Sequence, residues 1–397
     1  MTTTNVSRRD MLRVGLGGLG AVSLSGSVPA MVSKFALVDR RDARVGSNVS
    51  SDNVLVIVQL TGGNDGLNTI IPGGDDVYAK ARPSIGLNDR LHRLDDRFAL
   101  NPGMAPFKAL FDAGRLAIVN GCGYPNPSRS HFKSLEIWHT GNAAGGAETK
   151  GWLGQYVEHV RRFAGARAGS ARCPLSAVNV GPEMPQALVA QSEVAASIPS
   201  VDDAEAAMQY LARQATNAVI DPHAIERAAA RSAPDADYPG GGLGPQLKLI
   251  AQLIAANLGT KFFYCQLAGF DTHANQLGQH ERLLANLSSA IAAFTKDMAA
   301  KGLGEKVTLM CFSEFGRRVE QNSSGGTDHG AAGPMFVVGG AVNGGIYGAH
   351  PSMTELDDGD LKYTTDFRRV YATLLDGWLN VRSSAILGNA FEPIAFM

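Results

Sequence analysis

Six short runs of apolar and β-branched residues constrain the fold of this chain more than any other feature of its sequence. Each run is five to seven residues long. Continuous apolar runs of this length are typical of strands that are covered on both faces of a sheet. We therefore predict six buried strands: VLVIVQL (54–60), LAIVNG (116–121), SAVNV (176–180), KFFYCQL (261–267), VTLMCF (307–312) and MFVVGG (335–340).

Two longer segments, 244–258 and 365–379, carry apolar residues at helical spacing. In the first, Leu247, Ile250 and Ile254 share one face of the predicted helix. Because predicted strands and helices alternate along the chain, the fold class that we expect is α/β. The expected architecture is a three-layer α/β/α sandwich with a largely parallel central sheet.

The sequence predicts a single α/β domain over residues 51–397, preceded by a linker at 31–50. We find no internal repeat. The alanine-rich segment 184–242 ends in YPGGGLG. We interpret it as a helical insertion closed by a flexible joint, or alternatively as part of the helical layer.

The N-terminus has the features of an export signal. Arg8 and Arg9 precede a mildly apolar, glycine-rich stretch at 14–24, and Val28-Pro29-Ala30 offers a cleavage site. The apolar stretch is too short for a stable membrane span. We therefore predict that residues 1–30 engage the twin-arginine export machinery and that the mature protein is periplasmic or otherwise exported. The alternative is a disordered basic tail.

Charge and cysteine content exclude some partners. The formal net charge is -1, and no basic run is interleaved with aromatic residues, so we expect no nucleic-acid binding. The four cysteines show no CxxC spacing. Cys265 and Cys311 lie in predicted strands and are expected in the core. Cys122 and Cys173 could pair in an oxidising compartment, which spacing alone does not decide.

Polar side chains capable of chemistry follow several of the predicted strands. In open α/β sheets, ligand sites form beyond the carboxyl ends of the strands. We therefore expect the loops after these strands, together with the segment GTDHG, to open on one edge of the sheet. These loops carry Asp65, Ser130, His131, Asp271, His273, Glu314, Arg317, Asp328 and His329.

Asp271, His273 and His329 form the first predicted metal site. Two neutral imidazoles and one carboxylate suit Zn²⁺ or a similar divalent ion and leave a position open. Asp271 and His273 are two residues apart, so an extended backbone turns both side chains to the same side. In the alternative interpretation, Asp271 caps a helix that starts near Asn275 and His273 fills a surface gap.

Asp65 and Glu314 form a second candidate pair. Carboxylates favour a harder ion such as Mg²⁺, Mn²⁺ or Ca²⁺, and two ions together can clamp the attacking and leaving oxygens of a displacement. The alternatives are that Asp65 only forms a turn within GGNDG and that Glu314 pairs with Arg317 or Arg318.

The segment PSRSHFKSLEIW is predicted to be a loop that enters a helix, with Ser128 or Ser130 at its start. A helix N-terminus favours an anionic group, so Ser130 is our candidate nucleophile. His131 is a candidate base for its activation, and Arg317 a candidate for holding substrate oxygens. The alternative is that Ser130 only caps the helix.

Seven motifs are spread along the chain: LTGGNDGLNTIIP, SRSHFKSLEIW, GWLG, FDTHANQ, FSEFGRRVEQN, GTDHGAAGPMFVVGG and TDFRRVYATLL. In combination they resemble the domain-of-unknown-function 1501 family, exported bacterial proteins that commonly carry a twin-arginine signal. That family is placed in the alkaline-phosphatase-like superfamily, with sulfatases and cofactor-independent phosphoglycerate mutases. The resemblance implies an alkaline-phosphatase-like α/β/α sandwich and a two-metal hydrolase.

Residue by residue, the resemblance implies that Asp65 is the early acidic ligand and Ser130 the nucleophile. It also implies that Asp271, His273 and His329 hold the first metal.

The chain departs from the superfamily pattern at the second metal. An Asp-His pair usually follows a late strand, whereas this chain reads Ser313-Glu314-Phe315. The Asp and His of FDTHANQ also stand closer together than in alkaline phosphatases.

Two functions are therefore expected. The first is an exported metal-dependent hydrolase that uses a serine nucleophile on phosphate or sulfate esters of a small molecule or a polymer. The alternative is a non-catalytic envelope binding or assembly protein on a degenerate phosphatase-like fold. A zinc peptidase is disfavoured because the sequence contains no HExxH motif.

Overall fold

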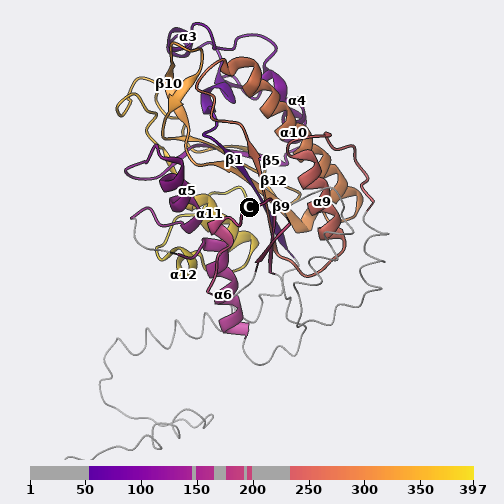
Figure 1. Cartoon of the computed structure of the whole chain (residues 1–397). Coiled ribbons are helices and arrows are strands. Elements are labelled where there is room, and N and C mark those ends of the chain that lie inside the picture. Colours follow the sequence, from indigo (N-terminus) through magenta and orange to yellow (C-terminus); the bar gives the residue numbers. More distant parts are fainter. Residues whose placement is uncertain (1–52, 145–148, 165–175, 192–194, 199–232) are drawn as a thin grey trace, which may run out of the picture. The chain divides into compact units, whose positions relative to one another are not determined.

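A central sheet organises the part of the chain that the structure describes (Figure 1). The predicted export signal at 1–30, the linker at 31–50 and Cys173 lie outside the described residues. No helix within the described ranges is both long enough and apolar enough to cross a bilayer. The computed structural model describes residues 53–144, 149–164, 176–191, 195–198 and 233–397.

The sheet that these residues form has nine strands, in the order β13-β5-β12-β9-β1-β8-β6-β7, with β14 also paired to β5. Strand β12 runs antiparallel to both of its neighbours, and the other pairs in the sheet are parallel. The strands are β1 (Val54–Thr61), β5 (Leu116–Gly123), β6 (Ala177–Val180), β7 (Ala195–Ile198), β8 (Phe262–Ala268), β9 (Val307–Ser313), β12 (Gly333–Gly339), β13 (Gly345–Tyr347) and β14 (Thr365–Asp366).

The six apolar runs form β1, β5, β6, β8, β9 and β12, with ends shifted by at most two residues. Strand β1 lies between β8 and β9, so Val58 stands opposite Cys265 on one side and Cys311 on the other. The predicted α/β fold class and the largely parallel sheet are confirmed.

Alternate residues of β1 face opposite sides of the sheet. Val56 and Val58 pack in one core with helices α4, α9 and α10. Leu55 and Ile57 pack in a second core with α5, α6, α11 and α12. Burial of each such side chain contributes about 1.5–3 kcal/mol. Figure 1 shows the two groups of helices on opposite faces: α4 (Ala105–Asp112), α9 (Gly244–Ala255) and α10 (Gln276–Ala300), against α5 (His131–Thr140), α6 (Trp152–Ala164), α11 (Phe367–Thr373) and α12 (Ser383–Leu387).

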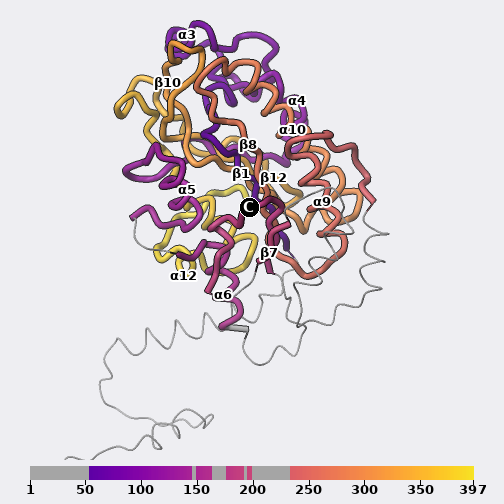
Figure 2. The backbone as a smooth tube through the Cα atoms, viewed as in Figure 1, coloured from indigo at the N-terminus to yellow at the C-terminus, as the bar shows by residue number. Residues whose placement is uncertain are grey.

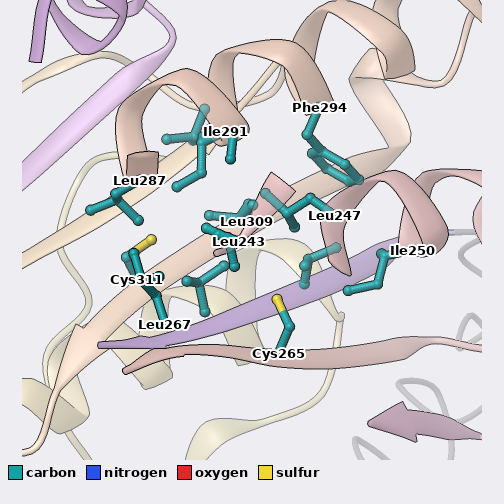
Figure 3. Packing of buried hydrophobic residues seen from close by; sticks show 14 of the residues in the cluster. Leu243, Leu247, Ile250, Cys265, Leu267, Leu287, Ile291, Phe294, Leu309 and Cys311 are labelled. Carbon is teal, nitrogen blue, oxygen red and sulfur yellow. The ribbon is translucent and has the colours of Figure 1, made fainter. Parts of the chain in front are cut away.

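The first core is drawn in Figure 3. Leu287 and Ile291 of α10 and Leu247 of α9 point toward the sheet, where they meet Cys265 and Cys311. Both cysteines are free and buried, as expected, and burial raises the pKa of each thiol. These two residues therefore act as small apolar core side chains.

Two of the predicted helices begin or end at different residues in the structure. The segment 365–379 begins as β14, continues as α11 and closes in a π-helical turn, η6 (Leu374–Trp378). Asp366 starts α11 because its side chain accepts the backbone N–H of Arg368. The helix predicted at 244–258 ends earlier, and Asn257, with φ of 51°, does not fit a right-handed helix.

The predicted insertion at 184–242 is only partly described, and its described part is not wholly helical. Strand β7 lies within it and pairs in parallel with β6 at the edge of the sheet (Figure 2). Alternate residues of AASI are buried, which is the pattern of an edge strand rather than of a helix. Residues 199–232 lie outside the described ranges.

Smaller elements lie outside the central sheet, and one of them, η5 (Gly304–Lys306), directly precedes β9. They are the three-stranded sheet of β2 (Ile70–Pro72), β4 (Phe98–Leu100) and β3 (His92–Arg93), the two-stranded sheet of β10 (Arg317–Gln321) and β11 (Thr327–His329), helix α3 (Asp76–Ala81), and the 3-10 turns η1 (Gly66–Asn68), η2 (Pro102–Met104), η4 (Gln186–Leu188) and η5 (Gly304–Lys306).

The direction of β12 determines which loops meet. Strands β1, β5, β8 and β9 run parallel, so the loops that follow them emerge at one edge of the sheet. Because β12 is reversed, its beginning lies at that same edge. The segment before β12, which carries His329, therefore joins the loops that follow the other strands.

Candidate metal centre and its surroundings

Three histidines surround the carboxylate of Asp271. The Nε2 atom of His329 lies 2.9 Å from Asp271 Oδ1, and that of His273 lies 3.0 Å from the same oxygen. His131 approaches from α5, with Nε2 3.6 Å from Asp271 Oδ2. The Nε2 atoms of His273 and His329 are 3.0 Å apart. The structure thus brings together residues that are up to 198 positions apart in numbering, from His131 to His329.

Each imidazole is oriented through its other ring nitrogen. His131 Nδ1 donates to Glu314 Oε1 at 2.8 Å, and His329 Nδ1 donates to the carbonyl of Arg129 at 2.9 Å. His273 Nδ1 faces Asp328 Oδ1 at 3.4 Å. With Nδ1 carrying the proton, each Nε2 presents its lone pair to the centre of the cluster. Outer acceptors of this kind commonly fix the tautomer of metal-binding histidines.

The donor set fits a divalent cation. Among the described residues, His131, Asp271 and His329 form a group whose ligand atoms all lie within 4.8 Å of one another. Two ligands of a tetrahedral zinc ion lie roughly 3.3 Å apart, because each bond is about 2.0–2.1 Å long. The separations around Asp271 are close to that value. His273 adds a third nitrogen and thus a fourth ligand, so the cluster could hold zinc through one carboxylate and up to three imidazoles.

Buried Arg317 neutralises the carboxylate of the cluster. Its Nη2 donates to Asp271 Oδ1 at 2.7 Å and to the carbonyl of Phe270 at 3.0 Å. Its remaining bonds go to the carbonyls of Gly63 at 2.8 Å, Thr327 at 2.7 Å, and Gly62. The side chain has no exposed surface. Arg317 is therefore not placed to hold substrate oxygens, contrary to our expectation, because its donors are directed at the protein.

These contacts set the charge of Asp271. Burial raises the pKa of this carboxyl group, but its close contact with His329 and the hydrogen bond and charge of Arg317 outweigh that effect and lower the pKa to about 2. The pKa of His131 is raised, chiefly by its hydrogen bond to Glu314. Asp271 is thus an anion at neutral pH, which is the form that binds a metal.

Glu314 lies behind His131 and is fully buried. Its Oε1 also accepts the backbone N–H of Gly62 at 2.8 Å, and its Oε2 accepts the hydroxyl of Ser313 at 3.1 Å. Both carboxylate oxygens are therefore engaged with the protein. We predicted that Glu314 is a direct metal ligand. Its contacts fit better with a hydrogen-bond acceptor that orients His131.

Asp65 belongs to a separate buried network. Its Oδ2 accepts Arg82 Nη1 at 2.6 Å and Gln276 Nε2 at 2.5 Å, and both side chains of the Asp65–Arg82 ion pair are fully buried. Burial raises the pKa of Asp65. The charge and the hydrogen bond of Arg82 lower it by more than burial raises it, so the pKa lies below its usual value. The metal-ligand role predicted for Asp65 is replaced by an ion pair, because Arg82 is already in contact with its carboxylate.

Ser130 stands at the start of α5, directly before His131. The residue is exposed, and within the described structure its side chain makes no capping hydrogen bond. Its backbone N–H donates to Ser128 Oγ at 3.2 Å. The neighbouring Phe132 is 89% exposed. The hydroxyl of Ser130 is therefore available to solvent beside a helix N-terminus, as the nucleophile prediction requires.

Two features of the site were not recognised in the sequence. We interpreted His131 as a base, whereas it is part of the imidazole cluster. Gly62, at φ of 123°, packs so closely that a Cβ atom there would lie 2.3 Å from the backbone nitrogen of Asp271. The paired glycines of TGGND were the available signal, because glycine permits both this φ and this approach.

Comparisons with solved structures return distant similarities in fold. PsFucS1 sulfatase from Pseudoalteromonas sp. is 12% identical, with a TM-score of 0.40, over 93% of this chain and 75% of that chain. A protein in the alkaline phosphatase superfamily from Vibrio parahaemolyticus is 8% identical, with a TM-score of 0.39, over 90% and 79%. The soluble domain of lipooligosaccharide phosphoethanolamine transferase A from Neisseria meningitidis is 10% identical, with a TM-score of 0.37, over 85% and 92%.

No curated protein matches this chain in sequence. In contrast, a family match covers most of the chain, from the start of β1 to the region before α12. Residues 52–381 match the family described as protein of unknown function (DUF1501), and the chain therefore belongs to the DUF1501 family.

Proposed function

We propose that this protein is an exported metal-dependent hydrolase of phosphate or sulfate esters, with Ser130 as its nucleophile. The observation that carries this proposal is the convergence of three imidazole Nε2 atoms on the ionised carboxylate of Asp271, beside the N-terminus of α5. A cluster of neutral imidazoles and one carboxylate is the donor set of many catalytic zinc sites.

His131, Asp271, His273 and His329 would hold the ion. A bound divalent cation would supply Lewis-acid stabilisation of the charge that develops on an ester oxygen. Arg317 keeps Asp271 ionised through the hydrogen bond at 2.7 Å. The positive charge of Arg317 offsets the negative charge of Asp271. With a divalent ion bound, the cluster would therefore have a net positive charge, which favours an anionic ester.

Ser130 is suited to attack because its hydroxyl is exposed and adjoins the cluster in sequence. In the first step its Oγ gives up its proton and forms a bond to phosphorus or sulfur, while the bond from that atom to the ester oxygen breaks. The ester oxygen leaves with the electron pair and takes up the proton, which gives the alcohol. In the second step water displaces the serine and restores its hydroxyl. The free backbone N–H groups and positive dipole at the start of α5 favour the oxygens of the transferred group.

Location and substrate follow from the N-terminus and the site. We propose that residues 1–30 direct export in a folded state, so that the metal is acquired before translocation and the substrate lies outside the cytoplasm. The cluster is partly exposed: Asp271 is 48% exposed and His273 45%. This openness is compatible with an ester carried by a polymer as well as with a small molecule.

The proposal is tested with purified mature protein. Elemental analysis measures bound zinc, and aryl phosphate and aryl sulfate serve as substrates. We expect bound zinc in the wild type, loss of zinc in His329→Ala, and retention of zinc with loss of turnover in Ser130→Ala. Ser323→Ala, an exposed serine outside the cluster, is the matched control. Turnover that survives Ser130→Ala would remove the serine from the mechanism.

A second candidate function is a non-catalytic envelope binding or assembly protein. It is favoured by the engagement of Asp65 and Glu314 within the protein, which leaves no ligand set for a second ion among the described residues, and by the exposure of Phe132 beside His131. This candidate predicts at most one metal ion and no turnover of any ester. Hydrolysis that disappears in His329→Ala, with the fold intact, would contradict it.

A further inference from the structure

Gln276, the first residue of α10, joins the two loops that carry the imidazoles. Its side chain is fully buried. Thr272, which stands between Asp271 and His273, donates its hydroxyl to Gln276 Oε1 at 2.9 Å. Thr327, two residues before His329, donates its hydroxyl to the same oxygen at 2.6 Å. One amide oxygen therefore bridges segments that lie 55 positions apart, from Thr272 to Thr327.

The opposite end of the amide is fixed by a buried ion pair. Gln276 Nε2 donates to Asp65 Oδ2 at 2.5 Å, and Arg82 Nη1 donates to the same carboxylate oxygen at 2.6 Å. Because an ionised carboxylate only accepts, it determines which end of the amide is nitrogen. Arg82 is itself held by the carbonyl of Val319 in β10 at 2.9 Å.

Glutamine is the side chain that meets both requirements. It offers an acceptor to the two hydroxyls and a donor to Asp65 at the same time. Glutamate would place a second acceptor against the carboxylate, and leucine would fill the volume without either bond. Backbone bonds also connect the segments: Gln276 N–H donates to the carbonyl of Gly325 at 2.9 Å, and Thr327 N–H to that of Thr272 at 3.2 Å.

We propose that Gln276 is a positioning residue that sets the separation between the ligand pair Asp271–His273 and the ligand His329. The proposal rests on the proposed metal site for its functional meaning. Buried hydrogen bonds of this kind have a single arrangement, so they hold the imidazoles where one ion can reach all of them. Asp65 then acts through Gln276, without touching the metal or the substrate.

The first test measures the zinc affinity of the mature protein by competition with a chromophoric chelator. We expect Gln276→Leu to weaken zinc binding about 10–100-fold, which is the range for loss of a partner that orients metal ligands. Because both residues act through one amide oxygen, adding Thr272→Val to Gln276→Leu should weaken binding no further. The cobalt-loaded protein should show an altered visible absorption spectrum, which a loss of stability alone would not produce.

The control is Thr308→Val. Thr308 is a buried residue of β9 whose hydroxyl has no hydrogen-bond partner among the described residues. Its replacement should leave zinc affinity unchanged. Zinc affinity of Gln276→Leu within twofold of the wild type would overturn the proposal. If Gln276→Leu does not fold, the pair Thr272→Val and Thr327→Val takes its place, with the same expected loss of affinity.

A second test uses metal-free protein and separates this proposal from the proposed function. Amide hydrogen exchange of residues 271–273 and 327–329 should be at least tenfold faster in Gln276→Leu than in the wild type, with exchange in β1 and β8 unchanged. A wild type that binds no zinc would defeat the metal site. In that case the hydrogen-exchange measurement alone tests the positioning role of Gln276. Faster exchange confined to these two loops supports that role, and unchanged exchange overturns it.

Discussion

Replacing His280 by glutamine removes a buried imidazole whose protonation destabilises the folded chain. His280 lies in α10 and is 1% exposed. Its Nε2 donates to Asn64 Oδ1 at 2.9 Å, whereas its Nδ1 has no hydrogen-bond partner among the described residues. Burial lowers the pKa of His280 to about 4, with Asp65 acting in the opposite direction and the cations Arg82 and Arg317 adding to the decrease.

The pKa determines the sign and size of the effect. An unfolded histidine has a pKa of about 6.5, so the unfolded chain takes up a proton before the folded chain does. The stability contributed at neutral pH is therefore lost as the pH falls from about 6.5 toward the folded pKa of about 4. Linkage between these two values gives a loss of about 2 kcal/mol between pH 7 and pH 5, and about 3 kcal/mol by pH 4.

The measurement is the free energy of unfolding in urea at 25 °C, for the wild type and His280→Gln, at pH 7 and pH 5. Glutamine keeps an N–H donor for Asn64 and does not titrate. We expect the wild type to lose about 2 kcal/mol more than the variant between the two pH values. Equal losses would refute the reasoning. His139→Gln is a parallel case, because burial also lowers the pKa of His139 to about 4.

Three further predictions concern the site and the N-terminus. Glu314→Gln should weaken zinc binding about 10–100-fold without unfolding, because the amide replaces the carboxylate that holds the neighbouring imidazole, and calorimetric titration measures this. Gly62→Ala should lower the melting temperature more than Gly74→Ala: both glycines have positive φ, but a Cβ atom at Gly62 would meet backbone at 2.3 Å and one at Gly74 would meet nothing within 4 Å. Equal melting temperatures would contradict this account. Replacing Arg8 and Arg9 together by lysine should retain the protein in the cytoplasm, as measured by cell fractionation, and unchanged export would exclude a twin-arginine signal.

The strands were predictable because their signal is local. Val56 and Val58 belong to an uncharged apolar run, and such a run has few stable alternatives to a sheet covered on both faces. The same local reasoning failed at 365–379, where one helical pattern is divided into β14, α11 and a π-helical turn. Pairing of Thr365 with Cys122 in the sheet outweighs the helical preference of the first residues.

Part of the candidate site could also be predicted from the sequence, for a related reason. The carboxyl ends of parallel strands meet at one edge, so the approach of Asp271 and His273 to other loops follows from strand order alone. The inclusion of His329 depended on β12 being antiparallel, which no local pattern in the sequence reveals.

By itself, the sequence determined the buried strands, the α/β class and the residue types at the strand ends, because these depend on neighbours along the chain. Only the tertiary structure decided which partners each charged group contacts. Asp65 and Asp271 follow strands in the same way, yet one contacts Arg82 and the other contacts His273, His329 and Arg317. Whether a carboxylate lies in a buried ion pair or faces a cluster of imidazoles depends on the side chains within about 3 Å of it, and those side chains come from segments that only folding brings together.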